Sequence, residues 1–261
     1  MKIKKPIDNV KSEHLDKGVK PIMACVGSFD DFGYIERNNI RRSFRENQEG
    51  SHDVNFLYPT TFYNRKNFLN QERAFTISTV DNFDKFSELY IDCTGLIVTG
   101  KDKISGENIS FLTHQNPDEI LSANKSSFIE SLKKRLDQVK EKCRKGTIDA
   151  VIIGGNYIVV DKNKKEDLDE DKKHYKKQYL ESIKLLTEEI KKFFDFEPVV
   201  INGPKLTTGT DNVYYDNKHR KLYFMRQQVN PVSGDFLMSK VAKEKRGWEK
   251  ELKNKKSNEE K

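Results

Sequence analysis

The sequence contains few cysteines, and their spacing excludes the common structural uses of this residue. The 261 residues include 3 cysteines, at positions 25, 93 and 143. No two of them form a CxxC pair, and an odd number cannot be consumed by a set of disulfides. We therefore expect a reducing compartment, and neither a structural zinc site nor any other metal or cofactor is predicted.

Long apolar segments are also missing. No run approaches the roughly 18 apolar residues that a membrane-spanning helix requires. The first residues, "MKIKKPIDNVKSEHLDKG", contain no apolar signal core. These features predict a soluble protein that stays in the cytoplasm, without membrane insertion. A secreted effector exported without a cleavable signal would show the same pattern.

The net charge of +7 comes from the two ends of the chain. Residues 1–20 contain six Lys against three acids (+3), and residues 239–261 contain nine Lys or Arg against five acids (+4). The part between them is formally neutral, whereas nucleic-acid-binding proteins concentrate basic residues on a folded face. We predict a mobile basic arm at 1–20 and a charged tail at 239–261. Nucleic-acid binding through these tails is kept as an alternative function.

The hydrophobic pattern predicts a mixed α/β fold for residues 74–238, preceded at 21–73 by an extension or small subdomain. Strand-like and helical segments alternate, which is typical of a largely antiparallel sheet with two amphipathic helices packed on it. The expected strands are "AFTISTV" (74–80), "SELYIDCTGLIVTG" (87–100), "ENISFLTH" (107–114), "IDAVIIGGNYIVV" (148–160), "EPVVING" (197–203) and a hairpin at 212–228; the expected helices cover about 126–145 and 175–193. Cys143 falls on the apolar stripe of the first helix, so we expect it to be buried in the core.

A predicted hairpin places Cys93 near His114. If residues 102–106 form the loop, 101 pairs with 107, and paired positions have a constant index sum of 208. Cys93 and His114 sum to 207, one residue from direct opposition, and a bulge would make them opposed. Directly opposed Cβ atoms are about 4.5–5.5 Å apart. We therefore expect the thiol and the imidazole to reach each other.

A Cys–His pair suggests nucleophilic catalysis. A free cysteine has a pKa of about 8.5, so little thiolate exists at neutral pH unless a base accepts the proton. An imidazole accepts it, leaving a thiolate–imidazolium pair; the thiolate attacks a carbonyl carbon, and the imidazolium protonates the departing amine. The alternatives are a buried cysteine beside a surface histidine, or a metal pair for which no further ligands cluster nearby.

The order of these elements resembles the chemoreceptor glutamine deamidase (CheD) family and the related toxin-type protein glutamine deamidases. In that family a strand carries the nucleophilic cysteine, the next strand ends in the catalytic histidine, and a later strand runs into a Gly-Gly pair, matched here by "AVIIGGN". Cys93 and His114 occupy the two catalytic places. Ser87 lies six residues before the cysteine, where the family has a hydroxyl residue, and on an unbroken strand it would share a face with Cys93.

This resemblance implies the conversion of glutamine side chains to glutamate, with ammonia released through a thioester intermediate; transglutamination is a close variant. Cys93 would be the nucleophile and His114 the general base and acid, while Ser87 would orient the histidine or hold the substrate. The backbone N–H groups near Thr94 are candidates for stabilising the oxyanion. The expected rim of the substrate site is Gly154, Gly155, Asn156, Gln115 and Asn116.

The implied partner is a protein that carries a reactive glutamine, either a chemoreceptor or another protein. The flanks of both catalytic positions depart from the family pattern: "ELYID" precedes the cysteine and "QNP" follows the histidine. A catalytically silent protein-binding module with the same fold is therefore the alternative hypothesis.

Overall fold

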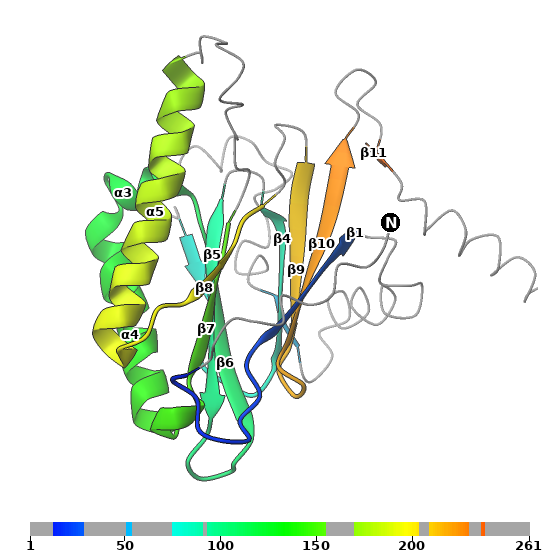
Figure 1. Cartoon of the computed structure of the whole chain (residues 1–261). Helices are drawn as coiled ribbons and strands as arrows, with labels where there is room; N and C mark the ends of the chain where they lie inside the picture. The colour runs from blue at the N-terminus through cyan, green and yellow to red at the C-terminus, as the bar shows by residue number, and fades with distance from the viewer. Residues whose placement is uncertain are drawn as a thin grey trace, which may run out of the picture.

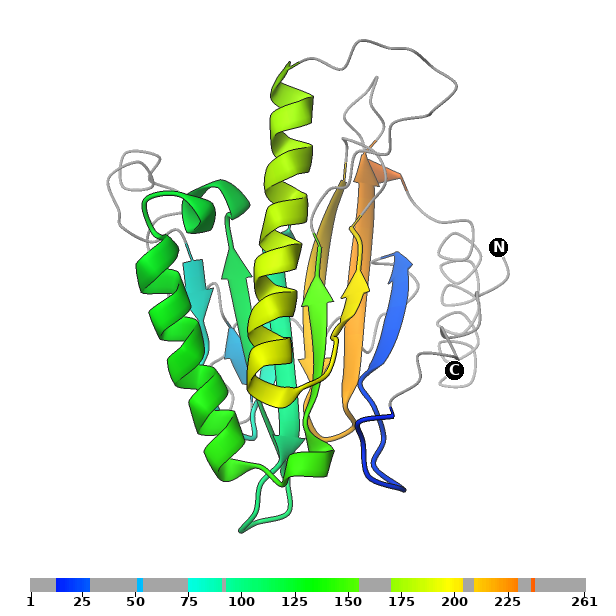
Figure 2. The ribbon, with the colours of Figure 1, turned by 60° about the vertical axis from the view of Figure 1, so that its left-hand side comes forward.

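The computed structural model has three layers: two β-sheets face each other, and helices cover the far side of one sheet (Figures 1 and 2). It describes residues 13–28, 51–53, 75–90, 93–154, 170–203, 209–229 and 236–237. We call the sheet between the helices and the second sheet the middle sheet, and the second sheet the outer sheet. In the described part of the chain, no helix is long and apolar enough to cross a membrane.

The middle sheet is largely antiparallel. Its strand order is β3 (Phe75–Ile77), β6 (Asn108–Gln115), β5 (Thr94–Lys101), β7 (Asp149–Ile153) and β8 (Val199–Ile201). Among the described strands of this sheet, only β7 and β8 pair in parallel. Helices α3 (Pro117–Leu121), α4 (Lys125–Lys142) and α5 (Glu170–Phe194) cover one face of this sheet. A 3₁₀ turn, Lys145–Thr147, connects α4 to β7.

The outer sheet covers the opposite face of the middle sheet. Its order is β1 (Met23–Ser28), β10 (Lys221–Val229), β9 (Gly209–Asp216), β4 (Asp84–Tyr90) and β2 (Ser51–Asp53), and β11 (Phe236–Leu237) also pairs with β10. The strand β1 belongs to the region that the sequence assigned to an N-terminal extension, yet it is an integral part of this sheet. The predicted mixed α/β class, with mostly antiparallel strands and amphipathic helices on a sheet, is confirmed.

Two apolar cores hold the layers together. The core under the helices contains the predicted stripe of α4, namely Phe128, Leu132, Leu136, Val139 and Cys143, all of them buried. The core between the sheets contains Ile97, Leu112 and Val151 from the middle sheet and Val213, Tyr215, Leu222 and Phe224 from the outer sheet. The side chains of β5 and β6 therefore alternate between the helix side and the outer-sheet side, as the two-residue period of a strand requires.

The strand expected at residues 87–100 is divided between the two sheets, so its prediction as one continuous strand is wrong. β4 ends at Tyr90 in the outer sheet, and β5 begins at Thr94 in the middle sheet. Both halves are apolar enough to be strands, but the sequence does not show that the chain crosses from one layer to the other between them. This crossing is what brings residues of β4 over the face of β6.

The β5–β6 register also differs from the prediction. Lys101 pairs with Asn108, so the loop contains residues 102–107 and the index sum is 209. Within this loop, Asp102 Oδ1 accepts the N–H groups of Ile104 (2.9 Å) and Ser105 (2.7 Å). Gly106 then adopts a φ of 73°, which favours glycine.

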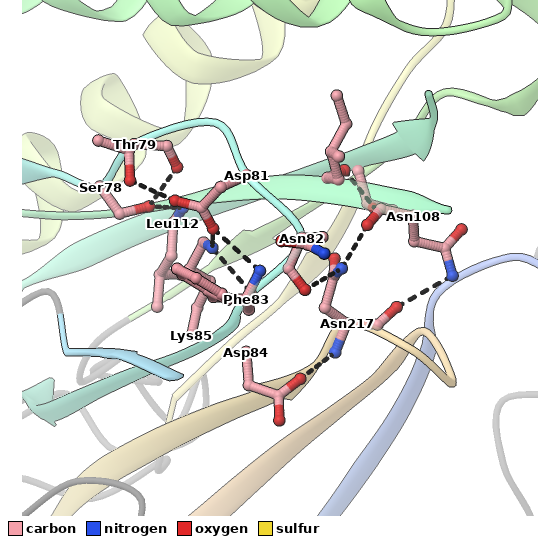
Figure 3. Close-up of polar contacts among 12 residues, drawn as sticks. Ser78, Thr79, Asp81, Asn82, Phe83, Asp84, Lys85, Asn108, Leu112 and Asn217 are labelled. Atoms are coloured by element: carbon pink, nitrogen blue, oxygen red, sulfur yellow. Dashed lines mark hydrogen bonds and ion pairs between the residues drawn. The ribbon is translucent and has the colours of Figure 1, made fainter. Parts of the chain in front are cut away.

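A polar seam ties the two sheets together where β6 begins (Figure 3). Asn217, in the turn between β9 and β10, donates its main-chain N–H to Asp84 (2.8 Å) and its side-chain amide to the carbonyls of Asn82 (2.9 Å) and Asn108. The side chain of Asn108 donates back to the carbonyl of Asn217 (3.0 Å). Because Asn108 and His114 lie at opposite ends of β6, this seam anchors the sheets at the end remote from the predicted site.

A fully buried lysine reinforces the same end. Lys85 Nζ pairs with Asp81 and donates to the carbonyl of Phe83 (2.7 Å), as Figure 3 shows. Burial lowers the pKa of Lys85, while the carboxylate of Asp81 opposes this shift. Asp81 also pairs through its main chain with Ser110 of β6. The connection from β3 to β4 is thus fixed to both sheets.

Part of the predicted N-terminal arm lies against the body of the protein. His14 stacks on Phe196 with ring centroids 3.9 Å apart, and its Nε2 lies 3.3 Å from Asp149 Oδ1. Asp149 Oδ2 accepts the N–H of Ile22 at 2.7 Å. These contacts differ from the mobile arm that we expected up to residue 20.

Candidate active site

Cys93 and His114 lie on the same face of the middle sheet, toward the outer sheet. His114 pairs with Gly95, and Cys93 is two residues before that glycine. The predicted direct opposition is therefore wrong by two positions, but an even shift keeps both residues on one face. Diagonal neighbours of this kind are about 7–8 Å apart, within reach of an aromatic side chain. Both residues are partly exposed.

Ser87 reaches His114 from the outer sheet. Its Oγ lies 2.9 Å from Nδ1 of His114, and the serine is fully buried. The expectation that Ser87 and Cys93 share a face of one strand is wrong, because β4 and β5 belong to different sheets. Ser87 and His114 nevertheless meet, since β4 crosses the face of β6 on which His114 lies, and Cys93 lies on that same face.

Tyr90, which the sequence analysis did not select, is an aromatic neighbour of the histidine. Its ring stacks on the imidazole with centroids 4.1 Å apart and planes 16° from parallel. Its hydroxyl donates to the carbonyl of Thr113 at 2.8 Å, and the residue is fully buried. Tyr90 therefore covers one face of the His114 ring.

Gly95 provides the space for this tyrosine. A Cβ atom at Gly95 would lie 2.6 Å from the carbonyl oxygen of Thr113, 2.8 Å from Tyr90 Cε1 and 2.9 Å from Tyr90 Oη. The side chain of Thr113 also connects β6 to β5, because its Oγ1 accepts the N–H of Leu96 at 2.8 Å. A glycine inside a strand often marks such a close approach, and this signal was present in the sequence two residues after Cys93.

Thr94 and Gln115 lie on the other face of the sheet, under the helices. Thr94 Oγ1 is 2.6 Å from Ser182 Oγ of α5 and accepts the amide N–H of Gln115 at 3.2 Å. Both residues are fully buried. The prediction of Gln115 as a rim residue is therefore wrong, because its odd position in β6 points it toward the helices. The role of the Thr94 backbone in stabilising an oxyanion stays a prediction.

The other predicted rim residues have different places. Asn116 is the N-cap of α3, where its Oδ1 accepts the N–H of Asp118 at 3.0 Å. Gly154 follows Ile153, which pairs with Gly95, so it lies beside Thr94, and it is buried. The hydroxyl of Tyr179 occupies the position that a Cβ of Gly154 would need. Gly155 and Asn156 lie outside the described residues.

The surroundings of His114 favour its neutral form. Although part of the residue reaches the surface, protein atoms surround the ring, and this desolvation lowers the pKa of His114 to about 4. At neutral pH the imidazole is thus unprotonated and able to accept a proton. The expected resting thiolate–imidazolium pair is disfavoured, so proton transfer would accompany the attack of the sulfur.

The other two cysteines have different environments. Cys143 is buried at the end of α4, and desolvation raises the pKa of its thiol to about 12. This agrees with the predicted core role and makes Cys143 a poor nucleophile. Cys25 is partly exposed on β1, at the edge of the outer sheet. Among the described residues, no group of three or more His, Cys, Asp or Glu side chains could hold a metal ion.

The depressed pKa of His114 predicts a loss of stability in mild acid. The unfolded chain binds the proton near the ordinary histidine pKa of about 6.5, whereas the folded chain binds it only near pH 4. The stabilisation from the neutral ring is present above pH 6.5 and is lost as the pH falls toward 4. At pH 5 the expected loss is at most about 2 kcal/mol, since partial exposure reduces it.

Urea unfolding at pH 7 and pH 5, compared with a His114→Gln variant, isolates this contribution from the other titrating groups. The wild type should lose more unfolding free energy than the variant over this interval. Equal losses in the two proteins would contradict the desolvated environment of the ring.

No protein-family model matches this chain. No curated protein sequence matches it significantly either. The resemblance to the chemoreceptor glutamine deamidases thus depends on the order of the elements and on the positions of Cys93, His114 and Ser87.

Proposed function

We propose that this protein is a cysteine-dependent amidohydrolase that converts glutamine side chains of a partner protein to glutamate and releases ammonia. The observation that supports the proposal is that Cys93 and His114 lie on the same face of the middle sheet. Both are partly exposed on this face, His114 in β6 and Cys93 immediately before β5, and the Ser87 hydroxyl lies 2.9 Å from His114 Nδ1. A nucleophile, a base and a group that orients the base form the arrangement required for covalent catalysis.

The hydrogen bond of Ser87 is compatible with the tautomer that this reaction needs, because a hydroxyl can accept the proton of Nδ1. For Nε2 of His114 to accept a proton, Nδ1 must carry the hydrogen and donate it to Ser87 Oγ. Cys93 Sγ then attacks the amide carbon of the glutamine side chain while its proton moves to Nε2. The C–N bond breaks, and Nε2 returns the proton to the departing nitrogen, which leaves as ammonia. Water hydrolyses the thioester, giving glutamate and the free thiol.

A catalytically silent protein-binding module is the second candidate. The same burial that keeps His114 neutral, with a pKa of about 4, also makes it a weaker base than an ordinary histidine. In such a module Ser87, Tyr90 and His114 would only connect the two sheets. Nothing in this candidate requires a reactive thiol at position 93.

Residue-resolved alkylation of the cysteines separates the two candidates. With limiting iodoacetamide at neutral pH, Cys93 should react on the order of tenfold or more faster than Cys25, because His114 lies on the same face as Cys93 and can accept the proton of its thiol. Cys25 is a suitable internal reference since it is also partly exposed. Cys143 should be the slowest, as its raised pKa and burial require. The labelled sites are quantified by peptide mass spectrometry.

The His114→Gln variant is the matched control, and it should reduce the rate at Cys93 to that of Cys25. Equal rates at Cys93 and Cys25 in the wild type would contradict the amidohydrolase and support the silent module.

A further inference from the structure

Tyr90 is joined to the candidate site by contacts that its burial alone does not require. Its ring lies 4.1 Å from the His114 imidazole, and its hydroxyl donates to the carbonyl of Thr113, the residue before the histidine. Tyr90 thus contacts both the side chain of His114 and the main chain of the preceding residue. It is also the last residue of β4, three positions before Cys93.

The middle sheet is adapted to admit this tyrosine. Gly95, directly opposite His114, leaves room for both the ring and the hydroxyl, since any Cβ there would lie within 3 Å of Tyr90. Thr113 contributes its carbonyl to Tyr90 and its hydroxyl to the N–H of Leu96. Gly95 of β5 and Thr113 and His114 of β6 therefore surround the side chain of Tyr90, which belongs to the outer sheet.

The ring complements the constraint that Ser87 imposes. A single hydrogen bond at Nδ1 fixes the direction of one ring atom but leaves the imidazole able to tilt about that bond. The nearly parallel face of Tyr90, 16° from the plane of the imidazole, opposes this tilt. Offset or stacked contacts between aromatic rings are favourable beyond the area they bury. Together, the hydrogen bond of Ser87 and the stacked ring of Tyr90 hold the imidazole so that Nε2 points in one direction.

We propose that Tyr90 is a positioning residue of the Cys93–His114 site: it holds the imidazole in the plane from which Nε2 accepts the thiol proton. This inference depends on the proposed amidohydrolase function, because it assigns Tyr90 a role in the reaction of Cys93. A tyrosine that only fills the space between the sheets would have no effect on the sulfur once the protein is folded.

Two substitutions separate these roles. Tyr90→Phe keeps the stacked ring and removes the hydroxyl, whereas Tyr90→Leu removes the aromatic face. Tyr215→Leu is the matched control, because Tyr215 is a second fully buried tyrosine of the same inter-sheet core. Each variant is measured as the full chain, at a temperature where circular dichroism shows it folded.

The first readout is the NMR spectrum of the histidine ring protons, with His114 assigned through the His114→Gln variant. In the wild type, the Tyr90 ring should shift the His114 resonances upfield. The shift should persist in Tyr90→Phe and Tyr215→Leu and disappear in Tyr90→Leu. The second readout is the rate of Cys93 alkylation by iodoacetamide, which should fall about tenfold in Tyr90→Leu and stay within about twofold of wild type in the other two.

The outcomes distinguish this inference from the function on which it depends. If Cys93 is fast in the wild type but Tyr90→Leu alkylates at the rate of Tyr215→Leu, the positioning role is overturned and the proposed function stands. An unshifted His114 resonance in the wild type also overturns the positioning role. If Cys93 reacts no faster than Cys25 in the wild type, the proposed function fails and the inference fails with it.

Discussion

Cys93→Ala is expected to reduce ammonia release from glutamine-containing peptides by several orders of magnitude, because the covalent intermediate cannot form without the sulfur. The side chain is only partly buried at the margin of the inter-sheet core, so the substitution should change the unfolding free energy by about 1 kcal/mol or less. The substrate is a pool of peptides that each contain one glutamine. Ammonia is measured directly, and mass spectrometry detects the one-dalton increase of each glutamine that becomes glutamate.

Cys25→Ala is the control for this experiment. It removes a second partly exposed thiol from β1 of the outer sheet, and turnover should be unchanged. Turnover that survives in Cys93→Ala would contradict the assignment of the nucleophile. The same measurement in His114→Gln should show a loss of comparable size, since the two residues act in one step.

Gly95→Ala is expected to damage the site and to destabilise the fold. Its Cβ would lie 2.6 Å from the main-chain oxygen of Thr113, which cannot move without disturbing β6, and 2.8 Å from the Tyr90 ring. Over-packing of this kind typically costs about 1–3 kcal/mol of unfolding free energy. Because Tyr90 must shift away from His114, Cys93 alkylation should also fall by about tenfold.

Gly100→Ala separates the two effects, because it crowds the same strand at a distance from the site. A Cβ at Gly100 would lie 2.7 Å from the sulfur of Cys143 and 3.2 Å from Ile148. We expect a similar loss of unfolding free energy, measured by urea denaturation, with Cys93 alkylation unchanged. If Gly100→Ala slows Cys93 as much as Gly95→Ala does, general destabilisation rather than the displaced tyrosine explains both variants.

The sequence predicted the elements that depend on local periodicity. The stripe of α4 and the continuous apolar run of β7 appear where expected, because burial of one helix face or both strand faces leaves a direct pattern. The turn between β9 and β10 also follows from its Asp-Asn-Lys residues. Each of these features is determined by residues close together in the chain.

The parts that the sequence did not predict depend on how the layers meet. In the sequence, residues 87–100 form one strand-like run, and no local signal shows that the chain leaves one sheet and enters the other after Tyr90. The loop between β5 and β6 has six residues rather than the expected five, and inside it Asp102 Oδ1 accepts the N–H groups of Ile104 and Ser105, contacts that the sequence does not reveal. The contact of Ser87 with His114 was expected from resemblance, but its origin in the opposite sheet required the three-dimensional arrangement.

The origin of Ser87 and His114 in different sheets also determines when the pair can form during synthesis. β4 is held in the outer sheet by β9, with Ser87 paired to Val213, and β9 is among the last strands of the described chain. A nascent polypeptide that has emerged from the ribosome only through α5 contains Cys93, His114 and Ser87 but lacks this strand. The histidine can therefore gain its serine partner only after β9 has also been translated, so a chain interrupted before β9 would carry an unassembled site.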